Sequence, residues 1–134
     1  MNFPYIKLPG LTRRPVVPVV FTHKQTAIEP VMCVVDSGAD MSYFDLDLAS
    51  ELGLTVKELK RIDSWDITGH IFWGCLSDVN VVIGGHEFKI PAIFSDQITR
   101  PFCVLGQEGL FDQARITFER YKWNIDIRPR TDLN

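Results

Sequence analysis

The chain has 134 residues, of which 46% are hydrophobic and 23% are charged, as expected for a soluble globular protein with one core. Its net charge of −3 favours neither nucleic acid nor an anionic membrane as a partner, and no basic run is long enough to follow a phosphate backbone. No apolar run could span a bilayer, and the first ten residues lack the apolar segment of a secretory leader, so we expect a cytoplasmic location.

The N-terminal third of the chain predicts an arm followed by two strands. Residues 1–13 are expected to form an arm that leads into an edge strand, because prolines stand at positions 4, 9, 15 and 18. Two runs rich in β-branched residues follow at 16–21 and 31–35, separated by a polar stretch. Such runs predict two strands of a meander, and the second leads directly into an acidic loop.

The acidic loop reads Asp36-Ser37-Gly38-Ala39-Asp40. Gly38 permits a tight turn, so the pattern predicts an ionisable carboxylate on a rigid loop at the end of a buried strand. An aspartic peptidase needs two such carboxylates, and the motif occurs once in this chain. Chance alone produces an Asp-Ser-Gly or Asp-Thr-Gly triplet in about one unrelated chain of this length in twenty. The alternative is therefore an ordinary β-turn, in which Asp and Ser serve only the turn geometry.

The next predicted element is a short helix over residues 45–52. Asp45 can cap its N-terminus, Leu48 and Leu52 share one face, and Gly53 can end it. The helix therefore begins only a few residues after the acidic loop.

The stretch from Ile62 to Gly74 predicts a hairpin with a glycine at its tip. Because apolar residues flank the tip, the hairpin resembles a mobile flap that can fold over a groove. The alternative is an ordinary hairpin whose apolar side joins the core, and the segment by itself favours this alternative. The flanking and tip residues are Trp65, Ile67, Thr68, Gly69, Ile71 and Phe72.

Two glycine signals follow the flap-like segment. Residues 79–83 and 86–90 flank Gly84-Gly85, which predicts a tight two-residue hairpin turn. Further on, the apolar run 102–105 ends at Gly106, where a glycine permits close backbone packing beneath a neighbouring loop. The alternative at this second site is a plain strand with a glycine before a helix.

The C-terminal part predicts a short helix over residues 106–114 and then a half-buried strand. Ile116 and Phe118 alternate with polar residues, and the alternation resumes over 121–128 with its parity shifted. We therefore expect the last strand to be entered through a bulge.

The cysteines and histidines carry no metal signal. Cys33, Cys75 and Cys103 are widely spaced in apolar contexts, so we expect reduced, buried thiols. The three histidines lack the spacing of a zinc site, and we assign neither a metal nor a cofactor.

The order of these elements resembles that of the retropepsins, the retroviral-type aspartic proteases. In both, an acid loop, a helix, a flap-like hairpin, a second hairpin, an apolar run ending in glycine, a helix and a strand follow one another. The resemblance covers the chain from Arg14 onward, and residues 105–112 and 116–118 are similar to the prokaryotic members. It implies a mostly β, small closed barrel with two short helices that functions as a homodimer. The implied division is an arm at 1–13, a protease domain at 14–128 and a tail at 129–134.

The resemblance also implies roles for particular residues. Asp36 would be the catalytic aspartate, and Asp36 of a second copy would complete the dyad. Ser37 would lock the two loops together, Gly38 would keep the space above the carboxylates clear, and Ala39 and Asp40 would line the groove. The flap would contain Ile67, Thr68, Gly69 and His70, and Leu105 and Gly106 would support the acid loop from beneath. The candidate groove walls are Val34, Trp65, Ile67, Ile71, Phe72 and Ile98.

One residue departs from the family pattern. Many retropepsins have an arginine directly after the second glycine, where it pairs with the acid at the Asp40 position, but this chain has Gln107. A buried carboxylate without a cationic partner is costly. Either Asp40 is partly exposed, or Arg14 of the partner subunit supplies the charge. The departure therefore bears on the strength of the dimer more than on the chemistry.

The resemblance implies a homodimeric aspartic endopeptidase that hydrolyses extended, apolar peptide segments with a shared dyad and an activated water. A second hypothesis, motivated by Gln107, is a peptide-binding or dimerisation module that keeps the barrel with weak or no catalysis. A third is that the second acid comes from a different protein.

Overall fold

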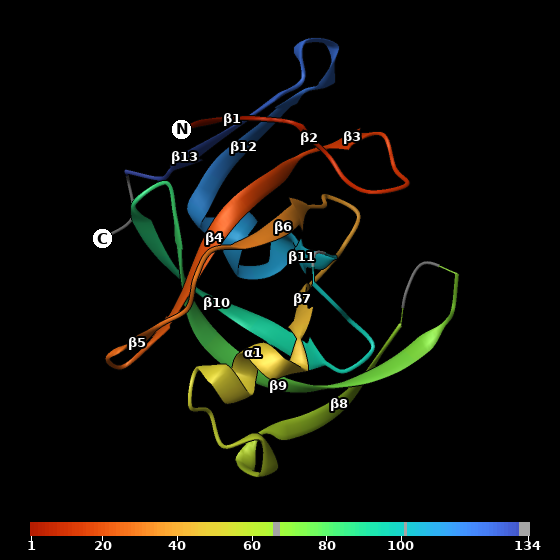
Figure 1. Cartoon of the computed structure of the whole chain (residues 1–134), viewed down its shortest axis with the longest axis vertical. Coiled ribbons are helices and arrows are strands. Elements are labelled where there is room, and N and C mark those ends of the chain that lie inside the picture. Colours follow the sequence, from red (N-terminus) through yellow and green to blue (C-terminus); the bar gives the residue numbers. More distant parts are fainter. Residues whose placement is uncertain (66–67, 101, 132–134) are drawn as a thin grey trace.

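The structure, a computed structural model, describes residues 1–65, 68–100 and 102–131. Its centre is a mixed β-sheet that closes on itself because its first long strand also pairs with a strand near the far edge (Figure 1). In order around the ring, the strands are β4 (Val16–His23), β6 (Val31–Val35), β11 (Cys103–Leu105), β7 (Ser42–Asp45), β10 (His86–Ser95) and β9 (Ile71–Ile83), and β9 pairs with β4. The predicted small closed barrel is confirmed.

The barrel strands form where the sequence alternates between the inside and the outside. In β6, Val31, Cys33 and Val35 are buried, and the two residues between them are half-buried. This confirms the predicted strand, and the predicted strand over 16–21 is likewise present in the longer β4. Two short strands extend the sheet beyond the ring, β5 (Thr26–Ala27) from β4 and β8 (Lys60–Trp65) from β9.

The hairpin between β9 and β10 turns at the predicted glycine pair. Gly84 and Gly85 have φ of 57° and 82°, a left-handed conformation that side chains disfavour. Both strands are longer than predicted. β9 pairs with β10 along its C-terminal part and with β8 along its N-terminal part. β9 thus belongs both to the barrel and to a hairpin that extends beyond it (Figure 1).

The predicted helix after the acidic loop is α1 (Leu46–Glu51). The Asp45 side chain accepts a hydrogen bond of 2.9 Å from the Asp47 N–H, which caps the helix as predicted. Leu48 and Leu52 are buried on one face, and Gly53 follows with a φ of +81°. A further 3₁₀ turn, η1 (Val56–Glu58), leads into β8.

The second short helix is shorter and less regular than the prediction over 106–114. The turn η2 (Gln107–Phe111) continues helically only through Gln113, and Gly109 interrupts it with a φ of +90°. A Cβ at Gly109 would lie 2.9 Å from Ile90 Cβ, so the close approach of this turn to β10 requires a glycine. Ala114, predicted to be helical, already begins the next strand.

The predicted strand over 121–128 is wrong at its start. Residues 120–122 form a 3₁₀ turn, η3 (Arg120–Lys122), and Trp123 has a φ of +54°. Instead of a bulge, this turn joins β12 (Ala114–Glu119) to β13 (Asn124–Pro129) as an antiparallel hairpin. Tyr121 therefore lies at the hairpin end with 82% of its surface exposed, which its place in the alternating pattern did not predict.

The N-terminal residues fold onto this C-terminal hairpin. β1 (Asn2–Pro4) pairs with β13, and β2 (Ile6–Lys7) pairs with β3 (Arg13–Arg14). The amine of Met1 lies 3.1 Å from Asp126 Oδ1, and this hydrogen bond lowers the pKa of Asp126. The division into arm, domain and tail stays a prediction, and residues 132–134 of the tail lie outside the described residues.

The three cysteines are free and buried, as predicted. Cys33 on β6 and Cys103 on β11 are register partners in the parallel ladder. Burial raises the pKa of the Cys33 thiol, whereas a hydrogen bond with Cys33 lowers the pKa of Cys103.

Across the described ranges, no helix is both long and apolar enough to cross a membrane.

The core is centred on three phenylalanine rings. The ring of Phe44 lies edge-on to Phe21 with the centroids 4.7 Å apart, and its centroid is 5.7 Å from that of Phe94. All three side chains are fully buried. We expect Phe44→Ala to lower the free energy of unfolding by about 3–5 kcal/mol, because it leaves a cavity among these rings.

Urea denaturation followed by circular dichroism measures this loss. Phe102→Ala is the matched control, since Phe102 is 44% exposed and should lose no more than about 0.5 kcal/mol. Equal losses in the two variants would contradict the placement of Phe44 in the core.

Candidate active site

The acidic loop is held by backbone hydrogen bonds from strands on both sides of β6. The Val35 N–H donates to the Pro15 carbonyl oxygen over 2.8 Å, and the Asp36 N–H donates to the Leu105 carbonyl oxygen over 2.9 Å. Asp36 is therefore fixed where β6 ends, beside the end of β11. Its side chain is exposed, so the carboxylate is available at the surface.

The turn after Asp36 orients its carboxylate. The Gly38 N–H donates to Asp36 Oδ1 over 2.8 Å, and the Ala39 N–H donates to the Asp36 carbonyl oxygen over 3.2 Å. A Cβ at Gly38 would lie 3.2 Å from Asp36 Oδ1, which is tighter than most side chains accept. The turn and the carboxylate thus fix each other, as the alternative β-turn interpretation also requires.

Gly106 lies directly against the acidic loop. A Cβ there would lie 2.0 Å from the Met41 carbonyl oxygen and 2.7 Å from that of Ala39, so only glycine fits. The Gly106 N–H donates to the buried Ser42 Oγ over 3.1 Å, and the Gln107 N–H donates to the Ala39 carbonyl oxygen over 2.9 Å. The structure therefore brings Leu105 and Gly106 together with the loop they were predicted to support.

A groove of about 860 Å³ opens beside Asp36. Of the predicted acid-loop residues, Ser37 does not line this groove. Of the predicted wall residues, Val34 and Ile71 do not line it either. The groove is lined by Asp36, Gly38, Ala39, Asp40, Tyr43, Trp65, His70, Phe72, Gln97, Ile98 and Val104.

The hairpin of β8 and β9 forms one wall of this groove. Trp65 and Ile71 are register partners near its end, and they are 64% and 49% exposed. The end of the hairpin therefore does not join the core, which the ordinary-hairpin alternative required. Of the predicted flap residues, Thr68, Gly69 and His70 are exposed at this end, and Ile67 lies outside the described residues.

Asp40 is exposed, so within this chain it needs no cationic partner. The side-chain amide of Gln107 instead donates to the carbonyl oxygen of Ser37. Arg14 donates to the Arg13 carbonyl oxygen over 3.4 Å. Of the two solutions considered for the missing arginine, the partial exposure of Asp40 is the one that the chain itself provides.

Four groove or supporting residues were not predicted, namely Ser42, Tyr43, Gln97 and Val104. The Tyr43 hydroxyl lies 3.1 Å from Ser64 Oγ, and its ring lies edge-on to Phe72 at a centroid distance of 5.1 Å. Val104 belongs to the apolar run before Gly106, where the alternation of side chains along a strand turns it away from the buried Cys103 and Leu105. No local pattern marks the other three, because their partners are distant in sequence.

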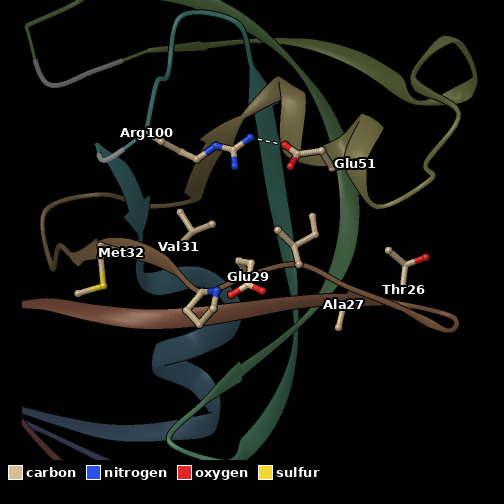
Figure 2. A pocket seen from close by; sticks show the side chains of 9 residues that line it. Thr26, Ala27, Glu29, Val31, Met32, Glu51 and Arg100 are labelled. Atoms are coloured by element: carbon tan, nitrogen blue, oxygen red, sulfur yellow. Dashed lines mark hydrogen bonds and ion pairs between the residues drawn. The ribbon is translucent and has the colours of Figure 1, made fainter.

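A second hollow, of about 550 Å³, lies on another part of the barrel between β5, β6 and α1. Figure 2 shows Arg100 reaching Glu51 across it. The hydrogen bond with Glu51 raises the pKa of Arg100, and Arg100 Nε also lies 3.5 Å from Asp45 Oδ2. No residue of the acidic loop lines this hollow, so we do not assign it to the active site.

The described residues contain no group of three or more histidine, cysteine or carboxylate side chains placed to hold a metal ion. Among the described residues that line the groove, Asp36 is the carboxylate that accepts a hydrogen bond from a turn N–H.

Comparison with solved structures shows which known fold this barrel resembles. A retropepsin-like aspartic protease from Rickettsia conorii matches over 95% of this chain and 90% of its own, with a TM-score of 0.65 and 15% sequence identity. The chain has a retropepsin-like fold. The match confirms the resemblance inferred from the order of the elements, and the mostly β barrel with it. No family model and no curated protein matches the sequence, so the likeness lies in the fold.

Ser42 offers a direct test of the support beneath the acidic loop of this retropepsin-like fold. Ser42→Ala removes the acceptor of the buried Gly106 N–H, and an unsatisfied buried donor costs about 1–3 kcal/mol. We expect this loss in the free energy of unfolding measured by urea denaturation. The exposed Ser50→Ala serves as control and should change stability by less than about 0.5 kcal/mol. A Ser42→Ala variant as stable as the control would contradict the hydrogen bond.

Proposed function

We propose that the protein is a homodimeric aspartic endopeptidase in which Asp36 of each copy supplies one half of a catalytic dyad. The observation that carries the proposal is the oriented, exposed carboxylate of Asp36 at the edge of a large groove. The retropepsin-like fold supports it. Since the motif occurs once per chain, a second copy is needed to supply the other carboxylate.

The proposed reaction needs the two carboxyl groups in different protonation states. Two carboxylates at a distance of about 3 Å cannot both be ionised cheaply, so they share one proton. The ionised member takes a proton from a bound water, which attacks the scissile carbonyl carbon. The protonated member donates its proton to the carbonyl oxygen, which gives a tetrahedral diol. When the diol collapses, the first carboxyl group gives the proton it took from water to the leaving nitrogen, the second takes a proton back from a diol hydroxyl, and the C–N bond breaks. Cleavage should therefore fall at both acidic and alkaline extremes of pH.

The exposure of the acidic loop supports pairing with a second copy. Asp36, Ser37 and Gly38 are all exposed in the single chain. A second loop lying against the first would cover them, with the Ser37 hydroxyl locking the two loops together. In such a dimer, Asp40 would form an ion pair with Arg14 of the partner subunit, as the family resemblance implies.

The groove favours an extended, apolar peptide as substrate. Its walls carry Trp65, Phe72, Ile98 and Val104, which together offer apolar surface to alternate side chains of a bound strand. The hairpin of β8 and β9 stands over one side, where closure would exclude water from the reacting carbonyl. A cytoplasmic location remains a prediction from the sequence.

We expect Asp36→Asn to abolish peptide cleavage and to leave the dimer intact, because Asn keeps the shape of the side chain but cannot exchange a proton. A peptide-library digest between pH 4 and pH 7 with mass-spectrometric readout measures this. Asp78→Asn is the control, since Asp78 is exposed on β9 and does not line the groove. Cleavage by Asp36→Asn at the wild-type rate would show the assignment to be wrong.

A second candidate function is a module that binds peptides without cleaving them. The contact of neutral Gln107 with the loop at Ser37, in place of a cationic partner for Asp40, favours it. The same digest separates the two functions when peptide binding is measured in parallel by fluorescence anisotropy. Binding without cleavage by the wild-type protein at every pH would favour the module.

The dimer itself is testable without a substrate. We expect sedimentation velocity to give about twice the mass of the 15.3 kDa chain at micromolar concentration. A persistent monomer would contradict the homodimer, and recovery of activity only on adding another protein would favour a heterologous second acid.

A further inference from the structure

β9 leaves the barrel and becomes part of the groove wall at Gly74. The ladder between β9 and β10 ends at the pair Cys75 and Phe94. A Cβ at Gly74 would lie 2.3 Å from Ile93 Cγ2 and 2.9 Å from the Phe94 carbonyl oxygen. The absence of a side chain therefore lets β9 cross closely over β10 before it continues with β8 beyond the barrel.

Past this crossing, side chains replace the backbone ladder. Ser95 Oγ donates to the Trp73 carbonyl oxygen over 2.6 Å, and the Trp73 N–H donates to Gln97 Oε1 over 3.2 Å. The Gln97 N–H donates in turn to Ser95 Oγ over 3.2 Å. The three residues form a closed hydrogen-bonded network that attaches the base of the flap-like hairpin to the loop after β10.

This network fixes the orientation of the Gln97 carboxamide. A carboxamide has an acceptor at its oxygen and two donors at its nitrogen. Because Oε1 accepts from Trp73, the nitrogen Nε2 is turned away from that backbone. Within the described ranges, Nε2 makes no hydrogen bond of its own. Gln97 is exposed and lines the same groove as Asp36.

The Gln97 carboxamide adds a donor to the ring N–H groups that Trp65 and His70 bring to the groove. Among the described lining residues, the carboxylates of Asp36 and Asp40 are acceptors when ionised, and the hydroxyl of Tyr43 lies against Ser64. An extended peptide presents main-chain carbonyl oxygens that remain unpaired unless the groove donates to them. A neutral amide donor suits a carbonyl oxygen and does not depend on pH.

We propose that Gln97 positions the substrate through both ends of its carboxamide. Oε1 holds the base of the flap through Trp73, and Nε2 donates to a main-chain carbonyl oxygen of an extended peptide in the groove. This inference rests on the proposed function, because it assumes that the groove beside Asp36 receives a peptide.

Two substitutions separate the two roles. At pH 7 the carboxylate of Gln97→Glu still accepts from the Trp73 N–H but has no donor, whereas Gln97→Ala loses both. Peptide affinity is measured by fluorescence anisotropy in the full-length Asp36→Asn background, with the library octapeptide that the wild-type protein cleaves fastest. Hydrogen–deuterium exchange of residues 71–75 is measured without peptide. Thr99→Ala is the control, since Thr99 is exposed on the same loop and does not line the groove.

We expect both Gln97 variants to bind the octapeptide about five- to tenfold more weakly, as the loss of one hydrogen bond predicts. Only Gln97→Ala should accelerate exchange of the Trp73 amide, and Thr99→Ala should change neither readout. Wild-type affinity in Gln97→Glu overturns the donor role. Unchanged exchange in Gln97→Ala overturns the flap attachment. If the wild-type protein binds no peptide, both the proposed function and the donor role of Gln97 are wrong. The exchange experiment uses no peptide, so it still tests whether Gln97 holds the base of the flap.

Discussion

The close approach of Gly106 to the acidic loop is the contact on which the site depends. Two chain segments that follow neighbouring strands, β6 and β11, cross here at a distance that admits no side chain. The crossing lets the Asp36 N–H reach Leu105 and the Gln107 N–H reach Ala39. These hydrogen bonds attach the acidic loop to the barrel strands. The carboxylate of Asp36 is therefore held in one position relative to the groove.

The groove is a product of the same barrel. Its lining includes Tyr43 of β7, Val104 of β11 and Phe72 from the part of β9 that extends past the ring. Tyr43 contacts Ser64 and Phe72, which are register partners on the two strands of the flap-like hairpin. One strand of the barrel therefore positions both halves of the hairpin, and the hydrogen bonds of Gln97 and Ser95 add a second attachment. β7 therefore supports both sides of the site: Ser42 accepts a hydrogen bond from Gly106 beneath the acidic loop, and Tyr43 contacts the hairpin of β8 and β9.

Elements with a strong local cause followed the sequence closely. The glycine pair at 84–85 and the Asp45 cap act within a few residues, and both were found where predicted. Predictions failed where distant packing overrode a local pattern. Gly109 was predicted inside a helix, but it lies against Ile90 of β10 with a φ of +90°, and the segment there is not a regular helix. Around Trp123, an apolar alternation typical of a strand instead contains a tight turn.

The sequence by itself determined the acidic loop, the strand that carries it and the order of elements typical of a retropepsin-like barrel, because each of these has a cause within a short window. The tertiary structure decided which side chains line the groove. Gln97, Tyr43 and Ser42 act through partners 20 or more residues away, and no spacing along the chain encodes such contacts. Closing the barrel brings them together, since only then do β7, β9 and the loop after β10 meet beside Asp36.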